Sequence, residues 1–234
     1  MRTPPPPRSQ TAALTVVELL VAMVVIAMLA ILSASALRKG VHSSRDVQCV
    51  SNLRQIWMRT QIYANENRGS FPWAHVVDGY RFWPQDINKA SGNSDMSCYI
   101  CPEVNSADLY KPLRERTGGS AYVNYGINFY GISASTATRE KYTPARITDL
   151  DEPSQVIAFI DNDHADQPYD GWYSAAQILT KQAWPMLSRR HGGKLNAIFC
   201  DGHVEKLDEN RLLSDPSKEF PWAAFRYIKP SPLP

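Results

Sequence analysis

Two residues near the carboxyl end have the chemistry of an acid–base or metal-ligand pair. Nine residues separate His191 from Asp201, and Gly202 follows directly. The apolar run 195–200 between them predicts a strand, which at about 3.3 Å per residue puts about 20 Å between its ends. We therefore expect His191 and Asp201 at opposite ends of a hairpin over 191–207. Asp and Gly both tolerate the positive φ that a tight hairpin turn requires. A hydrogen-bonded structural role is expected for His191, with a metal or catalytic role as the alternative.

Three carboxylates gather directly after a second apolar run, 156–160, which also predicts a strand. Asp161, Asp163 and Asp166 offer the hard oxygen ligands that Ca²⁺ takes in proteins. The glycine and the distal glutamate of an EF-hand loop are missing, so a solvated acidic turn is the preferred interpretation and calcium binding the alternative. The histidines of this half lack HExxH spacing, and no zinc hydrolase site is predicted.

The chain has four cysteines, an even number that permits three complete disulfide pairings in an oxidising compartment. They are Cys49, Cys98, Cys101 and Cys200. Cys98 and Cys101 form a lone C-x-x-C, and zinc would need a second such pair, which Cys49 and Cys200 do not form in sequence. Thioredoxin-type redox chemistry is not expected either, because the motif lacks a βαβ setting.

The amino-terminal part is dominated by an apolar stretch that contains a single acid. Residues 14–37 are twenty-four residues with Glu18 as their only charge before Arg38, and as a helix they would be about 36 Å long. That length predicts a transmembrane helix, preceded by a leader over 1–13. If the chain were cut before Leu14, the new amine would lie one helical turn from Glu18 and could neutralise this acid on a neighbouring copy.

The elements that must position these groups follow from periodicity. No proline interrupts residues 8–71, and over 38–69 apolar residues recur three or four apart, so we expect the helix to continue as an amphipathic half to about Asn67. Gly69 then provides a left-handed cap, and Pro72 blocks resumption. Beyond it, residues 70–234 show short strands between turn residues. The predicted fold is α+β, with one long amino-terminal helix packed on a small antiparallel sheet.

Residues 13–20 resemble the prepilin-type cleavage and methylation signal, in which a small residue precedes the cut and a glutamate stands fifth after it. The resemblance implies cleavage between Ala13 and Leu14 by a prepilin peptidase/N-methyltransferase. It implies a single-pass protein of the bacterial inner membrane with its carboxy-terminal domain periplasmic. It also implies assembly through Leu14 and Glu18 with other copies and with secretion-system assembly proteins, in a type IV pilus-like filament or a type II secretion pseudopilus.

A second resemblance lies farther along the chain, and together with the first it covers most of the sequence. Cys49, Asn52, Leu53 and the Gly69-x-Phe71-Pro72 exit are similar to a pseudopilin subfamily, and His191 with Asp201 and Gly202 resembles the His-X9-Asp-Gly domain found behind prepilin signals. Cys101-Pro102 and Cys49 both belong to that pattern, which favours a disulfide between these two cysteines. In a pilin-like fold the domains would be a leader (1–13), an assembly helix (14–37), its amphipathic continuation (38–69) and a β-rich head (70–234).

Composition limits the function further. Twenty-five basic against 23 acidic residues give a formal charge of +2, which provides no electrostatic footprint for nucleic acid. A hydrophobic content of 44 % is that of a globular chain. The expected function is a structural filament subunit, a pseudopilin and not an enzyme, with no certain cofactor beyond the calcium alternative. The competing hypothesis is a membrane-anchored extracytoplasmic binding or metal-dependent hydrolytic domain exported by a prepilin-type signal.

Overall fold

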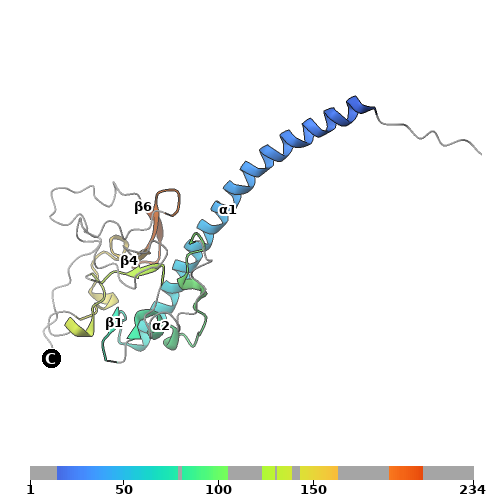
Figure 1. Ribbon diagram of the computed structural model, residues 1–234. Helices are drawn as coiled ribbons and strands as arrows, with labels where there is room; N and C mark the ends of the chain where they lie inside the picture. The colour runs from blue at the N-terminus through green and yellow to red at the C-terminus, as the bar shows by residue number, and fades with distance from the viewer. Residues whose placement is uncertain are drawn as a thin grey trace, which may run out of the picture. The chain divides into compact units, whose positions relative to one another are not determined.

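The structure, a computed structural model, describes residues 15–78, 81–104, 123–129, 131–138, 143–162 and 190–207. The chain divides into two compact units between Ser43 and Ser44. The expected leader and its cleavage site at Ala13 and Leu14 lie outside the described residues. The element order is shown in Figure 1.

Helix α1 (Val16–Glu66) is the longest element and contributes residues to both units. It ends close to the predicted position, in a Schellman motif. The N–H of Gly69 donates to the carbonyl of Ala64 at 2.8 Å, and both Arg68 (φ 57°) and Gly69 (φ 81°) are left-handed. The sequence predicted the left-handed residue at Gly69, and the structure adds Arg68, which stands at the C′ position.

The second half of α1 packs into the core of the second unit. Its buried residues are spaced three or four apart, as an amphipathic helix requires: Cys49, Asn52, Leu53, Ile56, Arg59, Thr60 and Ala64. A two-stranded antiparallel sheet, β1 (His75–Val76) with β2 (Arg81–Phe82), leads into α2 (Trp83–Ala90). Trp83 is fully buried and packs against Tyr99 of the 3₁₀ helix η1 (Ser97–Tyr99), with ring centroids 5.4 Å apart.

The main sheet has four antiparallel strands in the order β3-β4-β5-β6. They are β3 (Tyr125–Ile127), β4 (Ile157–Asp161), β5 (Leu195–Phe199) and β6 (Val204–Leu207). Every residue of β4 and β5 is buried, so both faces of the sheet centre are covered. The sequence predicted the last three strands to within a residue. Tyr99 lies in the 3₁₀ helix η1, and three further 3₁₀ turns among the described residues, η2 (Thr136–Thr138), η3 (Ile147–Asp149) and η4 (Pro153–Gln155), occupy loops.

The predicted pilin-like fold with a membrane half needs correction. Over the ranges that the structure describes, no helix is both long enough and apolar enough to cross a membrane. The expected transmembrane helix over 14–37 and the single-pass inner-membrane location are therefore wrong. The fold is α+β with two antiparallel sheets rather than one.

Candidate functional site

Four potential metal ligands from distant parts of the chain meet in the second unit. Cys49 lies on α1, Cys101 follows η1, Asp161 ends β4, and His191 stands in the turn before β5. One ligand atom from each lies within 4.8 Å of the other three. Cys49, Cys101 and Asp161 are 0 % exposed and His191 is 6 % exposed, so the group is closed off from solvent. We refer to these four residues as the Cys-His-Asp cluster.

Nε2 of His191 is central to the cluster. It lies 3.4 Å from Sγ of Cys101 and 3.2 Å from Oδ2 of Asp161. The two sulfurs of Cys49 and Cys101 are 2.6 Å apart, about 0.6 Å longer than a disulfide bond, and all four cysteines are free thiols. The two cysteines that the resemblance pairs are therefore neighbours in the structure, but no disulfide bond joins them. Cys98 and Cys200 are buried outside the cluster.

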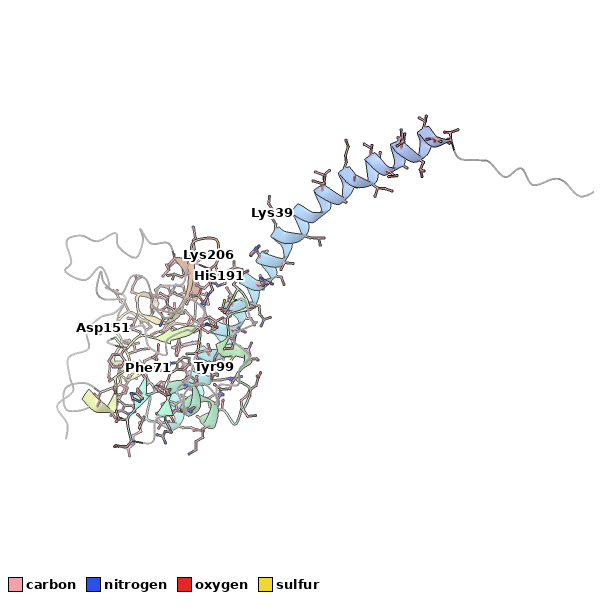
Figure 2. All side chains as sticks on the ribbon, in the orientation of Figure 1. Lys39, Phe71, Tyr99, Asp151, His191 and Lys206 are labelled. Carbon is pink, nitrogen blue, oxygen red and sulfur yellow. The ribbon has the colours of Figure 1, made fainter. Side chains whose placement is uncertain are left out.

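A shell of polar groups holds the cluster in place. Nδ1 of His191 lies 3.1 Å from Oδ1 of Asp46, which also accepts a hydrogen bond from Nδ2 of Asn196 and forms an ion pair with Lys206. The backbone N–H of Asn196 donates to Oδ2 of Asp161 at 2.6 Å. The backbone N–H of Cys101 donates to the side chain of Asn124 at 3.0 Å. His191 and Lys206 are labelled in Figure 2.

Two consecutive glycines explain how His191 reaches the cluster. Gly192 (φ 68°) and Gly193 (φ 83°) both adopt the left-handed conformation that other residues rarely take. They reverse the chain between His191 and the start of β5. As a result, His191 contacts Asp161, the last residue of β4. Strand β5 separates His191 from the Asp-Gly turn at Asp201.

The pKa values of the cluster residues are shifted because several acidic groups lie close together in a buried site. The pKa of Cys101 is lowered to about 6, chiefly by the hydrogen bond from Cys49 and further by His191 and Arg190, against the opposing effect of burial. The pKa of Cys49 is raised because it keeps the proton of this sulfur pair. Burial alone would lower the pKa of His191, but Asp161 and Cys101 outweigh it and raise the pKa to about 10. At neutral pH the arrangement favours a thiolate at Cys101 beside an imidazolium.

The donor set corrects the calcium interpretation in part. Two sulfurs, one imidazole nitrogen and one carboxylate are ligands of Zn²⁺, whereas Ca²⁺ takes oxygens only. Asp161 faces His191 inside the core instead of standing in an open acidic turn. Asp163 and Asp166 lie outside the described residues.

The structure separates His191 from Asp201, as the strand length predicted. Oδ1 of Asp201 accepts the backbone N–H of His203 at 3.1 Å and lies 2.6 Å from its Nδ1. The turn itself differs from the expected two-residue Asp-Gly turn. Residues 200–203 separate β5 from β6, Gly202 is left-handed with φ 91°, and Asp201 is not among the described residues with positive φ. Asp201 caps the turn through its carboxylate instead.

Glu18, in the first unit, has a local partner that the sequence analysis missed. The N–H and hydroxyl of Thr15 donate to Oε2 of Glu18 at 2.9 and 3.0 Å, and the N–H of Glu18 donates to the Thr15 hydroxyl at 3.3 Å. This reciprocal pair is a capping box, and the spacing Thr-x-x-Glu before an apolar run is its sequence signature. The hydrogen bonds from Thr15 lower the pKa of Glu18.

Asp46 is the other residue that sequence reasoning did not single out. It precedes Cys49 by three positions on α1, so the two lie on the same helix face. The spacing by itself does not identify a site. Asp46 is linked to the cluster only because the fold brings His191 to within 3.1 Å of its carboxylate.

Comparison of the chain with protein-family models, with curated proteins and with solved structures found no match. The resemblances at residues 13–20 and 191–202 therefore have no family evidence behind them.

Proposed function

We propose that this protein is a structural subunit that assembles with copies of itself into a pilus-like filament through the first half of α1. Cleavage before Leu14 by a prepilin-type peptidase would release the assembling form. The observation that carries the proposal is the exposed apolar surface of residues 16–32. We call this segment the assembly segment.

The assembly segment combines a high apolar content with high exposure. Its large hydrophobic side chains are between 49 % and 75 % exposed, from Val25 to Val16. They are Val16, Val17, Leu19, Leu20, Val21, Met23, Val24, Val25, Ile26, Met28, Leu29, Ile31 and Leu32. Soluble monomers rarely expose contiguous apolar patches larger than a few hundred Å², and larger patches mark interaction sites.

The distribution of these side chains around the helix indicates more than one neighbour. Consecutive apolar residues such as Val24, Val25 and Ile26 point in different directions, because successive residues on a helix are rotated by about 100°. A dimer would cover one side only, whereas a bundle of copies covers all sides. Each Val, Leu, Ile or Met side chain that is buried on assembly contributes about 1.5–3 kcal/mol.

Glu18 supplies the polar contact that can set the register of neighbouring copies. Both hydrogen bonds that it accepts from Thr15 go to Oε2, which leaves Oε1 at the helix amino terminus for a donor on another copy. The α-amine of Leu14 in the cleaved chain is such a donor and is positively charged below a pH of about 8. An ion pair shielded by assembled helices is stronger than one in water.

The test uses the mature chain starting at Leu14 and a pair of matched charge insertions on α1. Ile26 is 65 % exposed inside the assembly segment, and Val47 is 68 % exposed outside it. Sedimentation velocity and electron microscopy after detergent removal should show filaments for the unaltered chain and for Val47→Glu, but dispersed subunits for Ile26→Glu. A monomeric unaltered chain, or filaments from Ile26→Glu, would overturn the proposal.

A further inference from the structure

We propose that the Cys-His-Asp cluster binds one zinc ion, with Cys49, Cys101, Asp161 and His191 as its four ligands. This inference is independent of filament assembly, because all four residues belong to the second unit. The ion would be structural, since four protein ligands complete the tetrahedral coordination that zinc prefers.

The spacing of the donor atoms fits a tetrahedral ion along two of its edges. With Zn–S near 2.3 Å and Zn–N or Zn–O near 2.0–2.1 Å, the edges of the ligand tetrahedron are about 3.3–3.8 Å. Nε2 of His191 lies 3.2 Å from Asp161 and 3.4 Å from Cys101. The sulfur pair at 2.6 Å must part by about 1 Å to admit the ion. A thiol and a thiolate that share a proton can lie close together. Once a cation replaces the proton, both sulfurs are thiolates, and their mutual repulsion moves them apart.

A buried polar atom also points to a ligand in this place. Oδ1 of the fully buried Asp161 receives no hydrogen bond from any described residue, and a buried carboxylate oxygen without a partner is costly. A disulfide between Cys49 and Cys101 would neutralise the sulfurs but leave this carboxylate as it is. A cation beside Asp161 would compensate it directly.

The surrounding shell has the form that zinc sites require. A zinc-bound histidine almost always presents its second ring nitrogen to a carboxylate or carbonyl, and Asp46 lies 3.1 Å from Nδ1 of His191. Ligating carboxylates are themselves hydrogen-bonded, and Asp161 accepts the backbone N–H of Asn196. The contact of Asp161 is a hydrogen bond, whereas Asp46 lies at ion-pair distance from Nδ1 of His191 without forming a hydrogen bond to it.

The charge balance is also favourable. Two thiolates and one carboxylate carry three negative charges, and a divalent ion reduces the total to one. Arg190, next to His191 in the chain, adds a positive charge beside the site. Cysteine and histidine bind a metal ion only in their deprotonated forms, so zinc binding should weaken as the pH falls.

Zinc content of the full chain, purified anaerobically with ZnSO₄ and then desalted, tests the proposal. We expect one zinc per chain and four free thiols in the denatured protein. Cys49→Ser, Cys101→Ser and His191→Gln should each lower the bound zinc at least about tenfold. Cys98→Ser and Cys200→Ser are matched controls, because they remove buried thiols outside the cluster, and they should retain the metal.

A second measurement on the unaltered chain keeps the test decisive if the cluster variants do not fold. Co²⁺ in place of zinc should give the intense visible bands of tetrahedral coordination and a thiolate-to-cobalt charge-transfer band in the near ultraviolet. Metal-free protein after anaerobic loading, or an intact mass two hydrogens lower with Cys49 joined to Cys101 under those conditions, would refute the proposal. Equal zinc in the folded cluster variants and the controls would refute it as well.

Discussion

Oδ1 of Asp46 lies 3.1 Å from Nδ1 of His191, on the side of the ring opposite the nitrogen that faces Cys101 and Asp161. Helix α1 thereby contributes both a cluster sulfur, on Cys49, and the carboxylate that orients the histidine. A single turn of α1 thus carries both Cys49, a member of the cluster, and Asp46, which lies beside its histidine.

Replacing Asp46 by Asn should weaken zinc binding without changing its stoichiometry. The amide keeps the size of the carboxylate but loses the negative charge that lies beside Nδ1 of His191. Removal of such an outer partner typically costs 10- to 100-fold in metal affinity. Competition with a chromogenic chelator measures this change. Asp201→Asn is the control, since Asp201 contacts His203 at the other end of β5 and should leave the affinity unchanged. Equal affinities for both variants would contradict the role given to Asp46.

Arg59 should be important for the stability of the second unit. Its guanidinium is buried, and Nη1 donates to Oδ1 of Asn88 at 2.7 Å and to the carbonyl of Asp95 at 2.8 Å, while its charge lies 5.6 Å from the Tyr99 ring centroid. Arg59→Ala removes the donor to the carbonyl of Asp95 and one of two donors to Oδ1 of Asn88, which keeps the Tyr99 hydroxyl. We expect a loss of about 2–4 kcal/mol in the free energy of unfolding.

Urea unfolding followed by tryptophan fluorescence measures the effect of Arg59→Ala. Arg54→Ala is the matched control, because Arg54 is exposed on the same helix and its truncation should stay within about 0.5 kcal/mol. If both truncations had the same small effect, the buried hydrogen bonds of Arg59 would not stabilise the fold.

Gly202 should not tolerate a side chain. Its φ of 91° is left-handed, and an added Cβ would lie 3.0 Å from Nε1 of Trp57. Gly202→Ala combines backbone strain of about 1–2 kcal/mol with this close approach to α1. Gly92→Ala is the control, because Gly92 is also left-handed (φ 63°) but has open space around its Cβ position. Thermal unfolding should show the larger loss for Gly202→Ala, and a reversed order would contradict the contact with Trp57.

The turn between β5 and β6 should contribute to acid sensitivity through Asp201. Burial raises the pKa of Asp201, but the backbone N–H and the side chain of His203 outweigh burial and lower it. A lowered folded-state pKa means that the stabilisation is present above the unfolded value of about 3.9 and is lost as the pH falls through the folded value.

Asp201→Asn removes this titration, so the stability difference between the two proteins should shrink as the pH falls below the unfolded value of about 3.9 and through the lowered folded value. Urea unfolding at closely spaced pH values measures the difference. A difference that stays constant over this range would show that the Asp201 carboxylate does not stabilise the turn through its charge.

Glu18→Gln separates the two roles of Glu18. Glutamine can still form the capping box with Thr15, since that motif accepts Glu or Gln at this position. It cannot form an ion pair with the amine of Leu14. If the charge sets the register of assembly, filaments should require at least about tenfold more protein for Glu18→Gln than for the unaltered chain. Assembly at unchanged concentrations would leave Glu18 with its capping role alone.

Local features of this chain were readable from its sequence because they depend on neighbours in the chain. Three-to-four spacing predicted the buried face of α1 beyond Ser44, and Gly69 with Pro72 predicted its end. The apolar runs around the Asp-Gly pair predicted the β5–β6 hairpin. The capping box at Thr15 was equally local and could have been found by the same reasoning.

The tertiary structure decided most of the grouping of the site. The resemblance paired Cys49 with Cys101, but the sequence placed Asp161 in a possible calcium loop and His191 in a hairpin motif, and nothing joined these two residues to the cysteines. They meet because α1, the β4 end and the turn at Gly192 and Gly193 converge on one buried position. Ligands separated by 30 residues or more at every step along the chain leave no spacing pattern, since their distances are set by how elements pack and not by how the chain is bonded.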